Sequence, residues 1–173
     1  MKKYIIAIDQ STSASKVFLI GEKGAILRRF SAPHRQYYPF PGGSEHDTEE
    51  IWQNVLRGIK EVSAGIEPEE IAALSICNQR ETTAFWDRDT GKPLRKSIVW
   101  QDVRAGALCE ELADHKTHIR KVTGLDLSPY YSGAKAAHAL REDKELAKKA
   151  RDGEALIGTM DSCLIYQIGR AHV

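Results

Sequence analysis

The feature that most constrains the fold is a set of three strand-like runs at the start of the chain, separated by short polar turns. The runs cover residues 4–8, 17–20 and 25–30. The first is continuously apolar, which is the pattern of a strand buried on both faces. The turns are rich in Ser, Thr and Gly, residues that favour tight reversals of the backbone. The three runs therefore predict a β-meander.

A helix is expected after a loop rich in Pro and Gly over residues 33–44. Asp47 suits its N-cap, and Glu50, three residues on, would be the reciprocal partner in a capping box. Apolar residues then recur at helical spacing from Ile51 to Val62. These signals predict one amphipathic helix directly after the meander.

The later segments alternate between strand-like and helix-like patterns. Strands are expected over residues 71–77, 82–86, 97–100 and 156–157, and helices over residues 101–113, 119–122 (stopped by Gly124), 132–150 (one or two helices) and 161–168. Strands mixed with helices in this way predict the α/β class.

The composition is that of an ordinary globular protein, with 42% hydrophobic and 28% charged residues. A net charge of +1 gives no reason to expect nucleic acid or an anionic membrane as a partner. Three cysteines far apart argue against a disulfide framework and against a zinc knuckle. No stretch is long and apolar enough for a membrane span. We expect a cytoplasmic protein without a nucleic-acid partner.

Residues 9–16 are the first candidate site, a small polar turn between two apolar strands. Such a turn can present backbone N–H groups to an anion, and Thr12 and Ser13 add hydroxyl donors. Asp9 can hold a hydrated Mg²⁺, and Lys16 can neutralise phosphate charge. Phosphoryl transfer needs such positioning and charge stabilisation. A solvated β-turn has the same composition, and no Walker A or G-x-G-x-x-G string is present.

Residues 78–83 are the second candidate site, a polar string at the end of an apolar strand. Arg80 and Glu81 together offer hydrogen-bond donors and acceptors to substrate hydroxyls. A surface ion pair is the alternative interpretation of these two neighbours. Neither candidate site is decisive by itself.

Taken together, the strings resemble known proteins. Residues 9–16 resemble the phosphate-binding hairpin of the superfamily of sugar kinases, heat-shock proteins and actin. Several further strings resemble the FGGY family of carbohydrate kinases and, within it, the kinases of glycerol. These strings are residues 45–47, 78–83, 91–94, 98–102, 123–125, 129–135 and 158–162. They follow the family's order over nearly the whole chain. The resemblance implies an actin-like ATPase, ribonuclease-H-like α/β fold with a mixed sheet flanked by helices.

The function that the resemblance implies is ATP-dependent phosphorylation of glycerol to glycerol 3-phosphate, with Mg²⁺. The implied roles are substrate binding by Arg80, Glu81, Trp100 and Tyr130, phosphate binding by Thr12, Ser13 and Lys16, and Mg²⁺ binding through water by Asp9. Core packing is the alternative for Trp100. Another polyol, a pentose or a pentulose is the alternative substrate. A catalytically dead polyol-binding module is the alternative function, and a homo-oligomeric full-length form is left open.

The first candidate site departs from the family pattern at Ser11, Ala14 and Lys16, and Ala14 stands where the family has threonine or serine. Ser11 stands where the family has glycine, which alone accepts a positive φ at low cost, so a different turn is expected. Lys16 stands where the family has arginine, whose bidentate fork a lysine lacks. These departures leave the kinase interpretation intact.

The resemblance also implies domain boundaries. Residues 1–167 correspond to an incomplete N-terminal domain, and the second, C-terminal domain of the family is absent from this sequence. The family's general base is an aspartate in a Gly-Asp-Gln string, which the sequence does not contain. We therefore expect the chain alone to be inactive. Residues 168–173 match a translated sequencing adapter, so a non-native tail is one interpretation; a native Gly-x-x-His-Val string is the other.

Overall fold

The computed structural model describes residues 2–170, and its chain divides into two compact units. Unit 1 comprises Met1–Arg35 and Asp47–Gln79, and unit 2 comprises Gln36–His46 and Arg80–Val173. Each unit has its own β-sheet, so the expected α/β fold contains two sheets, and the one in unit 1 is mixed.

Unit 1 is built on a four-stranded sheet in the order β3-β2-β1-β6. Its strands are β1 (Tyr4–Gln10), β2 (Ala14–Ile20), β3 (Ile26–Pro33) and β6 (Ile71–Asn78), with 3₁₀ turns η1 (Glu22–Gly24) and η2 (Pro68–Glu70) between them. The first three strands pair antiparallel, which confirms the predicted meander. β6 pairs parallel to β1, so this sheet is mixed.

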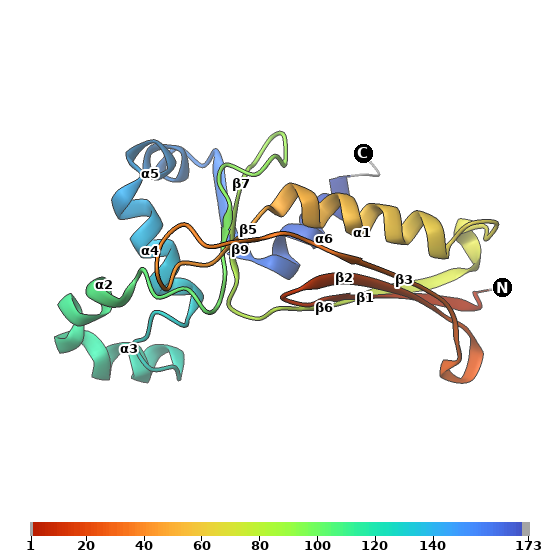
Figure 1. The fold of residues 1–173 in the computed structure, drawn as a ribbon, viewed down its shortest axis with the longest axis horizontal. Coiled ribbons are helices and arrows are strands. Elements are labelled where there is room, and N and C mark those ends of the chain that lie inside the picture. Colours follow the sequence, from red (N-terminus) through yellow and green to blue (C-terminus); the bar gives the residue numbers. More distant parts are fainter. Residues whose placement is uncertain (1, 171–173) are drawn as a thin grey trace. The chain divides into compact units, whose positions relative to one another are not determined.

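One helix, α1 (Thr48–Val62), runs along this sheet (Figure 1) and packs on β2 and β3. Its buried residues Ile51 and Val55 meet the buried face of the sheet, as the helical spacing predicted. Gly58 allows close approach, because an added Cβ would lie 2.5 Å from a methyl carbon of Val17 and 2.6 Å from the ring of Phe30. The sheet and α1 form the core of unit 1.

The start of α1 differs from a capping box. Asp47 is the N-cap as predicted, since its Oδ1 accepts hydrogen bonds from the backbone N–H groups of Glu49 and Glu50 at 3.0 and 3.3 Å. The carboxylate of Glu50 does not return a bond to Asp47. It accepts the backbone N–H of Arg35, at 3.2 and 3.3 Å, and so holds the segment that follows β3. The reciprocal half of the capping box was therefore wrong.

Unit 2 contains a five-stranded sheet in the order β4-β5-β8-β7-β9, with antiparallel pairing throughout. Its strands are β4 (Gln36–Tyr37), β5 (Glu45–His46), β7 (Thr83–Asp87), β8 (Ser97–Ile98) and β9 (Ala155–Thr159). The interpretation of residues 33–44 as an uninterrupted loop was wrong, because β3 extends to Pro33 and β4 lies within this stretch. A two-residue strand is too short to show an alternating pattern.

The helices of unit 2 follow the predicted order with shifted boundaries. They are α2 (Gly106–Glu111), η3 (Ala113–His115), α3 (Lys116–Thr123), α4 (Ser132–Glu142), α5 (Lys144–Arg151) and α6 (Met160–Arg170). α2 starts later than residue 101 because Asp102 accepts the backbone N–H of Arg104 at 2.9 Å, which holds a turn there. Gly124, with φ of 76°, caps α3 as predicted. Asp143 separates α4 from α5 and caps the latter.

Strand β7 is the centre of the unit 2 core. Phe85 on one face packs in a cluster with Ile98 and Leu146, and Ala84 and Trp86 on the other face pack against Cys163 of α6. The sheet is therefore flanked by helices, with α4 on one face of β7 and α6 on the other. None of the helices within residues 2–170 combines the length and the apolar character that crossing a bilayer requires.

The structure describes part of the segment, residues 168–173, for which a non-native origin is one interpretation. Residues 168–170 continue α6, and Arg170 donates a hydrogen bond to the carbonyl of Arg88 at 3.2 Å. Residues 171–173 lie outside the described residues. The non-native origin of residues 168–173 stays a hypothesis.

Candidate functional site

The residues assigned to a site from the sequence divide between the two units. Asp9, Thr12, Ser13 and Lys16 lie on the β1–β2 hairpin of unit 1, here called the phosphate hairpin. Arg80, Glu81, Trp100 and Tyr130 lie in unit 2, where they form part of what we call the polyol cluster. Each group is described within its own unit.

The turn of the phosphate hairpin is held by its own short side chains. Ser11 donates to the carbonyl of Ala14 from both its N–H (3.0 Å) and its hydroxyl (2.9 Å). Gln10 is fully buried and accepts the hydroxyl of Ser15 at 2.5 Å. Ser11 does not have a positive φ; in the described part of the chain only Lys23 and Glu81 do so among non-glycine residues. A serine therefore fits where the family has glycine, and the different turn expected from the sequence stays a prediction.

Asp9 and Lys16 face each other across the two strands of the hairpin. They are register partners, with Lys16 Nζ 3.2 Å from Asp9 Oδ2 and both side chains about two-fifths exposed, at 40% and 42%. An ion pair this exposed is weak, so both charges stay available to a ligand. Hydrated Mg²⁺ typically uses one or two carboxylates with waters and phosphate oxygens. The Asp9 carboxylate fits that requirement, although residues 2–170 contain no cluster of three or more potential metal ligands.

The phosphate hairpin lies at the carboxyl end of two parallel strands. Asp9 is opposite Cys77, and Gln10 is opposite Asn78. The backbone N–H of Gln79 donates to the carbonyl of Gln10 at 2.8 Å, which closes this edge. Ligands of open α/β sheets bind outside the carboxyl ends of their parallel strands, so the hairpin occupies the edge of the sheet where a ligand is expected.

His34 is a residue beside the hairpin that the sequence did not bring out. It is buried, and its backbone N–H donates to the carbonyl of Ser13 at 3.4 Å. Burial lowers the pKa of His34, against the smaller raising effects of the Thr12 backbone and Glu50. No sequence pattern marks this residue, because the contact depends on where β3 ends.

Glu81 is the most constrained residue of the polyol cluster. Its φ is 66°, a left-handed conformation that costs free energy in a residue other than glycine. Its Oε2 accepts both the backbone N–H and the hydroxyl of Ser132, each at 2.7 Å, so Glu81 caps the start of α4. No donor within residues 2–170 bonds the other oxygen, Oε1. Backbone strain of this kind concentrates at functional sites.

Arg80 precedes Glu81 and is exposed. Among the described residues, no carboxylate lies within ion-pair distance of its guanidinium group. Arg80 therefore does not form the surface ion pair of the alternative interpretation, although both residues lie in the loop between β6 and β7.

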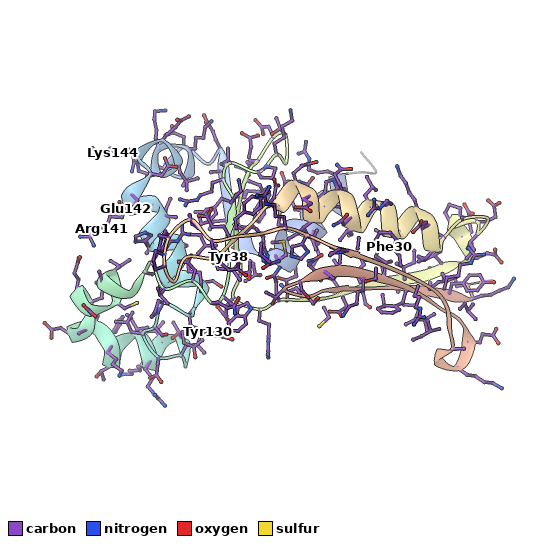
Figure 2. The ribbon with its side chains drawn as sticks, in the orientation of Figure 1. Phe30, Tyr38, Tyr130, Arg141, Glu142 and Lys144 are labelled. Carbon is purple, nitrogen blue, oxygen red and sulfur yellow. The ribbon has the colours of Figure 1, made fainter. Side chains whose placement is uncertain are left out.

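Two aromatic rings complete the predicted set. The rings of Trp100 and Tyr130 meet at a centroid distance of 5.9 Å and an angle of 66°, and Tyr131 lies edge-on to Tyr130 at 5.2 Å. The backbone N–H of Trp100 donates to the hydroxyl of Thr82 at 3.3 Å, close in sequence to Glu81. Trp100 is half-buried. Tyr130, labelled in Figure 2, is 39% exposed.

Lys135 ends one of the strings that resemble the family, but the sequence interpretation gave it no role in the site. It is fully buried in α4, and its Nζ donates to the carbonyl oxygen of Tyr130. Burial lowers the pKa of Lys135 to about 8, although the charges of Glu81 and Asp102 act to raise it. A lysine in an Ala-rich helix has the pattern of a solvated face, so its spacing gave no sign of burial.

Asp102 anchors a buried network on the same side of unit 2. It accepts the backbone N–H of Ser44 at 2.7 Å and both Nε and Nη2 of Arg104 at 2.8 Å. Arg104 Nη2 also lies 2.8 Å from Glu45 Oε1. Burial alone would raise the pKa of Asp102, but the bonds from Arg104 and Ser44 outweigh burial and lower it. The network fixes the segment after β8 that carries Trp100.

Comparisons with known proteins place the chain among carbohydrate kinases. Glycerol kinase 1 of Thermotoga maritima is 44% identical over 174 residues, covering 98% of this chain and 35% of that protein. Glycerol kinase of Bacillus subtilis is 41% identical over 179 residues, covering 100% of this chain and 36% of that protein. The chain thus spans about a third of the length of these relatives.

Solved structures give the same result for the fold. Plasmodium falciparum glycerol kinase with ADP superposes with a TM-score of 0.84 at 35% identity, over 94% of this chain and 33% of that one. Gluconate kinase from Lactobacillus acidophilus superposes with a TM-score of 0.81 at 22% identity, which shows a shared fold. The predicted actin-like ATPase fold is confirmed. Residues 4–173 match the N-terminal domain of the FGGY family, and the chain therefore belongs to the FGGY family of carbohydrate kinases.

Proposed function

We propose that the protein takes part in ATP-dependent phosphorylation of glycerol, transferring the γ-phosphoryl group to a terminal hydroxyl to give glycerol 3-phosphate. The observation that carries this proposal is Glu81, which has a left-handed conformation and caps the start of α4, and whose Oε1 accepts no hydrogen bond from a donor within residues 2–170. We place the reaction in the cytoplasm, where ATP is available.

The polyol cluster supports a small substrate with several hydroxyls. Glu81 Oε1 can accept a hydrogen bond from one hydroxyl, and the exposed guanidinium of Arg80 can donate to another. The rings of Trp100 and Tyr130 offer an apolar surface to the carbon skeleton. Ligand sites combine apolar walls with a few placed polar groups in this way.

The phosphate hairpin supports a nucleotide. Thr12 and Ser13 would contact its phosphates, Lys16 would neutralise part of their charge, and Asp9 would hold hydrated Mg²⁺. Mg²⁺, when bound, neutralises charge on the phosphoryl oxygens during transfer. The exposed Lys16 and Asp9 can reorient toward such a ligand without disturbing the core of unit 1.

The 173 residues contain no Gly-Asp-Gln string to supply a general base. We therefore expect this chain, tested alone, to bind polyol without turning it over, because the attacking hydroxyl is not activated. An assay for ATP-dependent glycerol 3-phosphate by the purified chain tests this expectation. Product formation above the blank would contradict it.

The experiment that tests substrate identity is titration of the purified chain by calorimetry with glycerol, a pentulose and gluconate. We expect saturable binding of glycerol alone, lost in Arg80→Ala. Arg141→Ala is the matched control, because Arg141 (labelled in Figure 2) is an exposed arginine that pairs with Glu111 at 2.6 Å. Binding of another polyol in place of glycerol, or equal loss in the control, would contradict the assignment.

A further inference from the structure

Lys135 is an unusual buried lysine. Its exposure is 0%, and among residues 2–170 no carboxylate lies within ion-pair distance of its Nζ. Within that range, the one hydrogen bond that Nζ donates is to the carbonyl oxygen of Tyr130. Burying an ammonium group without an ion-pair partner is unfavourable. A lysine that served only to fill space would be better replaced by an apolar residue.

The charges that face Lys135 come from three other segments of unit 2. Glu81 lies before β7, Asp102 follows β8, and Cys109 belongs to α2. Their interactions favour the ammonium form, but burial has the larger effect. The two carboxylates lie beyond ion-pair distance of Nζ, and the acceptor that the ammonium group contacts within the described residues is the carbonyl oxygen of Tyr130.

That contact joins the parts of the polyol cluster. Tyr130 presents its ring to Trp100 at 5.9 Å, and Lys135 Nζ lies 5.8 Å from the centroid of the Tyr130 ring. Two residues after Tyr130, Ser132 donates its N–H and hydroxyl to Glu81. The backbone from Tyr130 to Ser132 is thus held at one end by Lys135 and at the other by Glu81.

We propose that Lys135 is a positioning residue of the polyol cluster: its buried ammonium group fixes the Tyr130 carbonyl, and so sets the Trp100–Tyr130 ring pair against Glu81. This inference rests on the proposed polyol-binding function. It assigns Lys135 no contact with substrate. It also accounts for a buried charge that packing alone would disfavour.

The test compares three variants of the 173-residue chain. Lys135→Met keeps the length of the side chain and removes the donor, Lys135→Gln keeps a donor and removes the charge, and Lys144→Met is the matched control. Lys144 is an exposed lysine at the start of α5 (labelled in Figure 2). The readouts are glycerol affinity by calorimetry, urea unfolding at pH 7, and the indole N–H resonance of Trp100 without ligand, assigned with Trp100→Phe.

We expect Lys135→Met to weaken glycerol binding at least about tenfold, the loss of one well-placed interaction, and to shift the Trp100 resonance. Its urea midpoint should not fall, because a buried charge is removed. The glycerol affinity and the Trp100 resonance of Lys135→Gln should lie between those of Lys135→Met and the wild type. Both values of Lys144→Met should match the wild type. An unchanged Trp100 resonance and unchanged affinity in folded Lys135→Met would overturn the proposal. If Lys135→Met does not fold, the same two readouts of Lys135→Gln decide.

The outcomes also separate this inference from the proposed function. If wild-type chain binds no glycerol but the Trp100 resonance shifts in Lys135→Met, the substrate assignment fails and the positioning role stands. If wild-type chain binds glycerol and Lys135→Met binds it equally, the positioning role fails and the substrate assignment stands. A lower urea midpoint with unchanged affinity would show a structural role alone and would overturn the inference.

Discussion

The phosphate hairpin and the polyol cluster are built in different ways. The hairpin is local: Gln10, Ser11 and Ser15 hold its turn through bonds that span at most five residues. The polyol cluster depends on distant segments, since Glu81 meets Ser132 across 51 positions and Trp100 meets Tyr130 ring to ring. A local site tolerates the loss of one side chain, whereas an assembled site loses several alignments together. The following predictions test this difference.

The largest effect is expected at Glu81. Glu81→Ala should abolish glycerol binding and lower the free energy of unfolding by about 1–2 kcal/mol, because α4 loses its cap. Glu81→Gly is the matched variant: it also loses the cap, but glycine accepts the φ of 66° without strain. We expect it to be more stable than Glu81→Ala by about 1 kcal/mol and equally unable to bind. Calorimetry and urea unfolding check both, and equal stabilities would argue against strain at Glu81.

A second effect is confined to unit 1. Gly58→Ala should lower the free energy of unfolding by about 1–3 kcal/mol, because the new Cβ would overlap Val17 and Phe30. Gly133→Ala in α4 is the control, since nothing lies within 4 Å of its Cβ position, and it should be neutral or stabilising by up to about 1 kcal/mol. Urea unfolding measures both. A neutral Gly58→Ala would mean that α1 can move away from the sheet.

A third effect is a pH dependence set by Lys135. Its folded-state pKa of about 8 lies below the ordinary 10.5, so between these values the unfolded chain binds the proton more tightly and stability rises with pH. At pH 7 we expect Lys135→Met to be more stable than wild type by about 1 kcal/mol. This gain should shrink as the pH rises from about 8 toward 10.5. Unfolding at pH 7, 8.5 and 10 checks the trend, and a constant difference would contradict it.

The smallest effect on stability is expected at the hairpin. Lys16→Ala removes an exposed ion pair and should change the free energy of unfolding by less than about 0.5 kcal/mol, while weakening binding of Mg²⁺-ATP. Lys148→Ala is the control, since it removes the exposed pair with Asp152 at 2.7 Å and should leave nucleotide affinity unchanged. Fluorescence titration with a labelled ATP measures both. Equal affinities in the two variants would remove Lys16 from the proposed site.

The parts of the fold that depend on neighbours in sequence were predictable. The meander, the cap of α1 by Asp47 and the end of α3 at Gly124 follow from local pattern and backbone preference. The phosphate hairpin was found for the same reason. The backbone conformation of its turn was not predicted, because residue type alone does not determine the sign of φ at Ser11.

The parts that depend on distant partners were not predictable from pattern. Glu50 bonds Arg35 instead of its helix N-terminus, and Asp102 stops α2 from starting at residue 101. Lys135 lies buried although the segment 132–150, in which helices were expected, is rich in Ala, Lys and Glu. Arg80 and Glu81 were assigned from resemblance, but the left-handed backbone and the helix-capping bond of Glu81 required the structure.

The division of the chain into units has a consequence for how the protein can be cut. Residues 36–46 leave unit 1 after β3, supply β4 and β5 to unit 2, and return to begin α1. A cleavage after Gln79 therefore does not release an intact unit 2: β8 would lose its neighbour β5, and an unpaired strand edge would face water. Neither unit is one continuous segment of the chain. Deletion or exchange of either unit must therefore take account of the three points at which the chain passes from one unit to the other, at residues 35/36, 46/47 and 79/80.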